Sequence, residues 1–230
     1  MQPSFVTPAV PERPRSAWSL LSDALRRPGR RRALSVLWLL LFLAGAATFA
    51  HPVGTDLYSR YQQGSLHSQF GETNYTERYT AHTISSGDVL TKLVICRKGI
   101  ELTVLVVEGT TPVALRAGAG HDDGTPLPGE AGNVGIAGHR TTFGRAFNHL
   151  DELGPGDQVL LHTPTKIYHY VAVKPFAGHA NPWVTTPKDI SVIENLPGQH
   201  ALTLTTCNPK GSARQRLVLR LELDPTLTRT

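Results

Sequence analysis

An uncharged apolar run near the N-terminus limits how this chain can fold more than any other feature. Residues Ala33–Ala50 read ALSVLWLLLFLAGAATFA, 18 residues without a charged side chain. About 20 apolar residues span a bilayer as a helix, so the run predicts one transmembrane helix over residues 33–50. Small residues near its end also fit a cleaved signal peptide, but the long polar segment before it favours a retained anchor.

Positive charge is concentrated before this run. Residues 1–50 contain seven of the 23 Lys and Arg residues but only two of the 18 Asp and Glu residues. Residues 51–230 therefore contain 16 basic and 16 acidic residues. Basic residues mark the cytoplasmic side of a membrane helix, so residues 1–32 are predicted to be a disordered cytoplasmic arm and residues 51–230 to lie outside the cell. The part beyond the membrane has no net charge to attract phosphates, which argues against a nucleic-acid partner.

Residues 51–87 are predicted to form an extracytoplasmic helix and a linker. Apolar side chains recur at roughly helical spacing over residues 57–70, which favours a short amphipathic helix. Residues 71–87 are mostly polar and are interpreted as the linker.

Short β-type runs dominate the chain beyond residue 88. In Lys166–Phe176, for example, alternate residues form two faces, as in a strand with one buried side. The few short helices and six to eight strands predict an all-β domain, a closed barrel of about eight strands over residues 88–225, with a tail at 226–230. The predicted strands are Lys92–Cys96, Glu101–Gly109, Asn133–Ala137, Pro155–Thr163, Lys166–Phe176, His200–Thr206 and Arg216–Leu223.

Cys207 is the candidate nucleophile. It follows the β-type run HALTLTT and precedes Asn208-Pro209, so its side chain is expected at the end of a strand, on the barrel rim. A cysteine attacks carbonyl groups as a thiolate and needs a neighbour that stabilises negative charge. The alternatives are a buried structural cysteine and a disulfide with Cys96.

Two further side chains fit chemistry at this cysteine. His139 follows a short strand in AGHRTTFG and has the side chain of a proton donor or acceptor, although a histidine in a surface turn is the alternative. Arg216 begins the strand after Cys207, and a hairpin of about eight residues returns it to the cysteine, where its guanidinium suits an oxyanion. Arg214 and Arg220 are interpreted as solvated arginines at a sheet edge.

Together these motifs resemble the sortases, the membrane-anchored cysteine transpeptidases of Gram-positive bacteria. TLTTC at Thr203–Cys207, followed by an arginine within about a dozen residues, is similar to the sortase signature. AGHRTTFG, ELGPGDQV and TLTTCNPKGSARQR resemble the class E sortases of actinobacteria. The resemblance covers roughly residues 88–225 and implies a sortase-type β-barrel.

The resemblance also implies roles for individual residues. Cys207 is then the nucleophile, His139 the acid/base partner and Arg216 the arginine that steadies substrate and oxyanion. Thr206 supports them through its backbone or hydroxyl. The implied reaction cleaves an LAXTG- or LPXTG-type sorting signal of a secreted protein between Thr and Gly, through a thioester, and transfers the protein to an amine of peptidoglycan or lipid II.

The sequence predicts no cofactor and no metal, because its histidines and cysteines lack the spacing of a metal site. Two other functions stay open. An L,D-transpeptidase also pairs cysteine with histidine, but its cysteine follows a Ser-x-Gly context that is absent here. The other is a membrane-tethered barrel that binds a ligand without catalysis. Asn181-Pro182-Trp183 resembles the lid motif of pilin-polymerising sortases but follows the His139 strand, so it is not interpreted as a lid.

Overall fold

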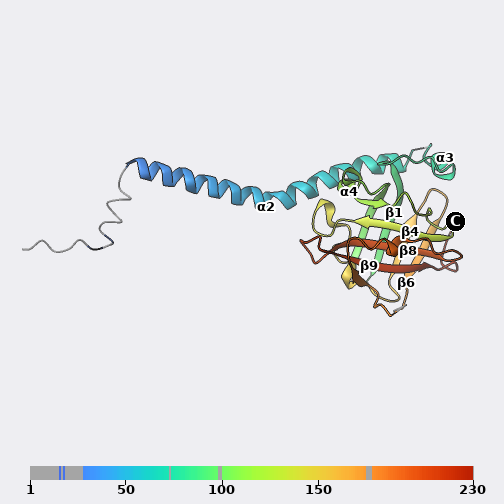
Figure 1. The fold of residues 1–230 in the computed structure, drawn as a ribbon. Coiled ribbons are helices and arrows are strands. Elements are labelled where there is room, and N and C mark those ends of the chain that lie inside the picture. The colour runs from blue at the N-terminus through green and yellow to red at the C-terminus, as the bar shows by residue number, and fades with distance from the viewer. Residues whose placement is uncertain are drawn as a thin grey trace, which may run out of the picture. The chain divides into compact units, whose positions relative to one another are not determined.

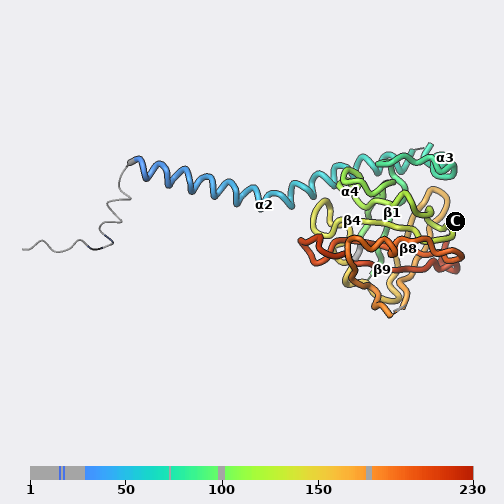
Figure 2. The backbone as a smooth tube through the Cα atoms, viewed as in Figure 1, coloured from blue at the N-terminus to red at the C-terminus, as the bar shows by residue number. Residues whose placement is uncertain are grey.

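The computed structural model describes residues 16, 18, 28–72, 74–97, 100–174 and 178–229, with only the backbone of residues 28, 100 and 101. The chain divides into two compact units, residues 1–50 and residues 51–230. Most of the predicted cytoplasmic arm, residues 1–32, lies outside the described residues. Figures 1 and 2 trace the chain from its N-terminal helix into the β-rich second unit.

A single long helix, α2, covers Pro28–Phe70. Its apolar part contains an 18-residue window with a mean hydropathy of 2.2, of which no residue is buried, as suits a helix that crosses a membrane. Residues 28–32, predicted to belong to the disordered arm, are helical. The predicted spans 33–50 and 57–70 are therefore parts of one helix, and Pro52 does not end it. Proline removes only one intrahelical hydrogen bond, which leaves the rest of the helix in place.

The stretch predicted as a linker is in fact packed against the barrel. It contains α3 (Tyr75–Thr80), and Tyr75 and Tyr79 are both buried. Their spacing of four residues puts both rings on one helix face, and the Tyr75 hydroxyl donates to the carbonyl of Leu90 at 2.7 Å. Together with Leu66 of α2, they form a second hydrophobic cluster under one side of the barrel.

Eight strands close into a mixed barrel, and a ninth lies outside it. Around the ring the order is β6-β5-β1-β2-β3-β4-β8-β9, and β6 pairs with β9 to close it. The pairs β2–β3 and β4–β8 are parallel and the others antiparallel. The strands are β1 (Val89–Arg97), β2 (Ile100–Glu108), β3 (Ala119–His121), β4 (Gly132–Gly138), β5 (Gln158–His162), β6 (Ile167–Ala172), β7 (Trp183–Thr185), β8 (His200–Asn208) and β9 (Gln215–Leu223).

The predicted closed barrel of about eight strands, preceded by a long apolar helix, is confirmed. The two strands that the sequence analysis did not predict, β3 and β7, have three residues each and are too short to show a periodic pattern. The strand predicted over Lys166–Phe176 ends at Ala172, and residues 175–177 lie outside the described residues. In the described parts of the chain, the short helices between strands are α4 (Pro112–Ala117), η1 (Phe143–Arg145), η2 (Leu150–Glu152) and η3 (Ile190–Ile193).

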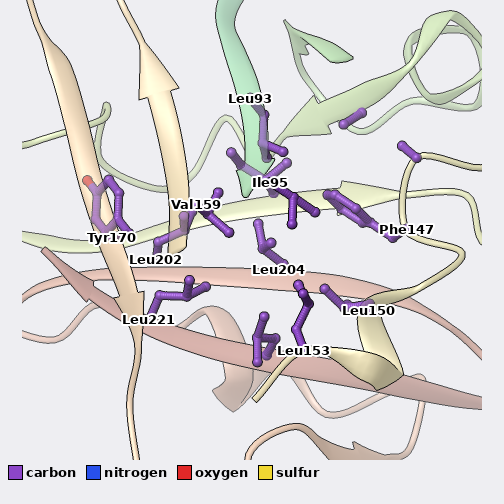
Figure 3. Packing of buried hydrophobic residues seen from close by; sticks show 14 of the residues in the cluster. Leu93, Ile95, Phe147, Leu150, Leu153, Val159, Tyr170, Leu202, Leu204 and Leu221 are labelled. Carbon is purple, nitrogen blue, oxygen red and sulfur yellow. The ribbon is translucent and has the colours of Figure 1, made fainter. Parts of the chain in front are cut away.

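The barrel interior is the main hydrophobic core (Figure 3). Leu202 and Leu204 of β8 and Leu221 of β9 point into it, because alternate residues of a strand face the same side. Residues of the opposite parity on β8 and β9, Cys207 and Arg216 among them, therefore face outward. This alternation puts the core leucines and the side chains of Cys207 and Arg216 on opposite faces of the sheet.

Candidate active site

The parallel pairing of β4 with β8 aligns His139 with Cys207. The last paired positions are Ala137 and Thr205. His139, the first residue after β4, and Cys207 of β8 each lie two residues further along the chain in the same direction, so they occupy equivalent positions at the same end of the barrel. Two segments that are 68 residues apart in the chain thus meet at one rim.

The antiparallel pairing of β8 with β9 places Arg216 directly opposite Cys207. Opposed residues of an antiparallel pair project from the same face, so the guanidinium and the thiol share the outer face of the sheet. Cys207 lies within β8, one residue before its end, and is partly exposed. Arg216 donates from Nη1 to the carbonyl oxygens of Ala213 and Gln215, both at 3.1 Å. The predicted hairpin return is confirmed.

Thr206 faces the opposite way from Cys207 and is buried. Its hydroxyl donates to the carbonyl oxygen of Gly138 at 2.7 Å. Gly138 immediately precedes His139, so this hydrogen bond joins the strand end that carries the cysteine to the strand end that carries the histidine.

His139 is half-buried beside an aromatic ring. The rings of His139 and Phe143 are tilted by 39° with their centroids 5.1 Å apart. Burial, and then the positive charge of Arg116, lower the pKa of His139 below its ordinary value. The imidazole is therefore mostly neutral at neutral pH and can accept a proton.

Arg140 is part of the site, although the sequence analysis assigned it no role. Its side chain is only 4% exposed. Nη1 donates to Oδ1 of Asn208 at 2.6 Å and to the carbonyl oxygen of Cys207 at 3.3 Å, and Nη2 pairs with Asp151 at 2.8 Å. Its position directly after His139 was the only sequence signal.

Cys96 and Cys207 are both free, and Cys96 is exposed, so the disulfide alternative is wrong. Arg214 is exposed, as expected. Arg220 is not at a solvated edge: it is 8% exposed, and its Nη2 donates to the carbonyl of Val192 at 2.9 Å. Packing of η3 over β9 covers it.

Within the residues that the structure describes, no group of three or more His, Cys, Asp or Glu side chains is arranged to hold a metal ion. Asn181, in the segment similar to a lid motif, is buried and bonds to the backbone of β9. Its side-chain amide donates to the carbonyl of Arg220 at 2.7 Å and its Oδ1 accepts from the Arg220 amide at 3.0 Å.

The fold and these side chains define a closed mixed barrel with a cysteine-centred site on its rim. Residues 95–224 match the family described as the Sortase domain, which is more than half of the chain. The chain therefore belongs to the sortase family, a family of cysteine transpeptidases, and the predicted resemblance is confirmed.

Relatives include class E sortases of actinobacteria. Sortase SrtE1 of Streptomyces coelicolor is 32% identical over an alignment of 136 residues, with coverage of 52% of this chain and 36% of that protein. The structure of sortase E from Streptomyces avermitilis is 33% identical with a TM-score of 0.54 and covers 63% of this chain and 92% of that one. A Clostridium perfringens sortase D5 transpeptidase has a TM-score of 0.58 at 27% identity, over 73% of this chain and 98% of that one. The match to SrtE1 thus spans little more than a third of that protein.

Proposed function

We propose that this chain is a membrane-anchored cysteine transpeptidase that cleaves an LAXTG- or LPXTG-type sorting signal between Thr and Gly and joins the protein to a peptidoglycan amine. One observation carries the proposal: Cys207 lies directly opposite Arg216 on β9 and at the position equivalent to His139 beside β4. A nucleophile, a proton carrier and a cation meet there, on three neighbouring segments.

In the first half of the reaction, neutral His139 takes the proton of the Cys207 thiol. The thiolate attacks the carbonyl carbon of the signal's threonine, and the tetrahedral oxyanion is stabilised by the Arg216 guanidinium. The C–N bond to glycine then breaks, the protonated His139 gives its proton to the leaving amine, and a thioester on Cys207 remains. The lowered pKa of His139 suits its role as the initial base.

In the second half, an amine of peptidoglycan or lipid II attacks the thioester carbonyl. His139 accepts the proton of the attacking amine, the C–S bond breaks, and the proton returns to the cysteine sulfur. The products are a new amide and the free enzyme, so the reaction needs no redox partner or metal. Thr206 supports these steps by bonding the β8 strand end to the Gly138 carbonyl.

The apolar part of α2 is proposed to hold the enzyme at the cell membrane as a single-pass anchor. The arginines before it, Arg26 to Arg32, favour a cytoplasmic N-terminus and an extracellular barrel. This topology keeps the site near both secreted proteins with a C-terminal sorting signal and wall precursors. Of the two signals, we propose the LAXTG type first, because that is what the resemblance to class E sortases implies.

Intact mass spectrometry of the full chain in detergent tests the proposal. With an LAXTG peptide, we expect a mass gain equal to the Leu-to-Thr acyl fragment, loss of that gain in Cys207→Ala, and its release by an added amine. Cys96→Ala is the matched control, because Cys96 is the exposed second thiol and is expected to leave the adduct unchanged. Absence of an adduct with both LAXTG and LPXTG peptides would reject the transpeptidase in favour of a binding domain.

A further inference from the structure

Three consecutive residues after His139 have left-handed backbone conformations. Their φ angles are 50° for Phe143, 78° for Gly144 and 52° for Arg145. Glycine adopts this region freely, whereas phenylalanine and arginine do so at a cost and only where surrounding structure holds them. The loop from His139 to Phe147 is closed by a hydrogen bond from the Phe147 amide to the His139 carbonyl at 3.1 Å.

One carboxylate of helix α2 holds this loop. Oδ1 of Asp56 accepts from the Gly144 amide at 3.1 Å, and Oδ2 pairs with Nη2 of Arg145 at 2.8 Å. Asp56 is 19% exposed in its side chain, so the pair is partly shielded from water. It belongs to residues 51–70 of α2, which lie in the same compact unit as the barrel.

The helix also approaches Gly144 too closely for any side chain. A Cβ added to Gly144 would lie 2.7 Å from Oγ of Ser59. Both the backbone angle and the contact with α2 thus favour glycine at this position. The loop therefore packs directly against α2 at Gly144, and both carboxylate oxygens of Asp56 bind it.

The Phe143 ring lies between helix α2 and His139. It lies 5.1 Å from the His139 ring, the Arg116 guanidinium lies 5.8 Å from the Phe143 centroid, and Tyr58 of α2 meets the ring edge-on at 6.3 Å. The phenyl ring is therefore surrounded by side chains from α2, α4 and the residue proposed as the proton carrier. Any movement of the loop backbone at residues 143–145 moves the ring that shields His139.

We propose that Asp56 is a positioning residue for the reaction: by holding Gly144 and Arg145, it keeps Phe143 against His139. The helix that leads from the membrane anchor is thereby part of the active-site support, and not only a tether. This role rests on the proposed function, because it takes His139 as the proton carrier. The contact between the loop and the helix does not depend on that function.

Loss of Asp56 is expected to let water reach His139. Arg116 of α4 acts on the imidazole through its charge. Arg140 follows His139 in the chain and bonds to the Cys207 carbonyl, Cys207 lies at the equivalent position on β8, and Arg216 lies opposite that cysteine. Burial is the main cause of the low pKa of His139, so a loosened loop raises that pKa toward its ordinary value of 6.5. A misaligned base also slows turnover more than it weakens substrate binding.

The test compares Asp56→Ala, Asp56→Asn and the full wild-type chain in detergent. Asparagine keeps an oxygen acceptor for the Gly144 amide but loses the charge that pairs with Arg145. Asp88→Asn is the matched control, because Asp88 forms an Asp–Arg pair with Arg78 at 2.9 Å and has no bond to the loop. Four quantities are measured for each variant: kcat and KM with an LAXTG peptide and an amine, the melting temperature, and the His139 titration midpoint. The midpoint is measured by NMR with histidine-labelled protein, and a His139→Gln chain gives the assignment.

We expect Asp56→Ala to lower kcat about tenfold or more with little change in KM, and to raise the His139 midpoint toward 6.5. Asp56→Asn is expected to fall between Asp56→Ala and wild type, and Asp88→Asn to keep the wild-type kcat and midpoint even if its melting temperature drops. The proposal is overturned if Asp56→Ala keeps the wild-type kcat and His139 midpoint. It is also overturned if Asp88→Asn loses as much kcat as Asp56→Ala at the same loss of melting temperature. Should the wild-type chain transfer no peptide, the proposed function fails, while the NMR midpoints still decide the positioning role.

Discussion

Arg140 donates a hydrogen bond from Nη1 to the main-chain carbonyl of Cys207 at 3.3 Å. The same nitrogen reaches Asn208 at 2.6 Å, and Asp151 holds the other end of the guanidinium. The residue after the histidine therefore fixes the backbone of the cysteine strand. With the Thr206 bond to Gly138, it gives two links between the strand ends that carry the two side chains proposed for catalysis.

Replacing Arg140 by alanine is expected to destabilise the fold by about 2–3 kcal/mol, because it removes charge-assisted bonds from a buried position. Arg140→Lys retains the charge but not the forked geometry, so it is expected to recover only part of this loss. Urea unfolding of the full chain in detergent measures both. Asp151→Asn serves as control: the Asp151 side chain is 41% exposed, so its cost is expected to be about 1 kcal/mol or less. Equal losses for Arg140→Ala and Asp151→Asn would contradict this account.

Thr206→Val removes the hydroxyl and keeps the side-chain shape. The Gly138 carbonyl then lacks its donor in a buried place, and the expected cost is about 1–2 kcal/mol of unfolding free energy. We also expect kcat to fall, since the ends of β4 and β8 lose one link. Thr206→Ser, which keeps the hydroxyl, is expected to restore most of kcat. Valine and serine variants with the same kcat would show that the hydroxyl does not align the site.

The pH dependence of turnover is expected to respond to Arg116. Its charge is the second cause, after burial, of the lowered pKa of His139, so Arg116→Met raises that pKa and moves the acidic limb of the kcat/KM profile to higher pH. Arg116→Lys retains the charge and is expected to keep the wild-type limb. If the acidic limb of the kcat/KM profile of Arg116→Met stays in place or moves to lower pH, the limb does not report a His139 whose pKa is lowered by the charge of Arg116.

The same shift affects stability. The native state binds fewer protons at His139 than the unfolded chain does between the lowered pKa and the ordinary value of 6.5. The contribution of His139 to stability is therefore complete above the ordinary value and decreases as the pH falls through this interval. In a His139→Gln chain, the fall in melting temperature over that interval is expected to be smaller than in wild type.

Gly144→Ala separates the backbone requirement from the contact with α2. Gly211 has nearly the same φ, 80° against 78°, but nothing lies within 4 Å of its added Cβ. Gly211→Ala is thus expected to cost about 1–2 kcal/mol from conformation alone. Gly144→Ala is expected to cost more, because the new methyl group meets Ser59, and Ser59→Gly is expected to recover the difference. Thermal or urea unfolding of the two alanine variants gives the comparison, and equal costs would mean that α2 does not constrain the loop.

Several features were predictable because they depend on local pattern. The apolar run at 33–50 predicted the helix, alternation predicted most strands, and TLTTC with a following arginine predicted the opposition of Cys207 and Arg216 across a hairpin. The same local reasoning failed where burial comes from distant segments. Residues 71–87 look polar, yet Tyr75 and Tyr79 are covered by the barrel, and Arg220, which reads as an edge residue, is covered by η3.

The amino-acid sequence by itself determined the apolar helix and the barrel class, and it predicted Cys207, His139 and Arg216 as candidate site residues, because each leaves a mark in residue type or short-range spacing. Only the tertiary structure decided that Arg140 holds the Cys207 backbone and that Asp56 holds the His139 loop. These partners are 67 and 88 residues apart in the chain. Their meeting depends on the parallel register of β4 with β8 and on the packing of α2 against the barrel, and no local periodicity encodes either one.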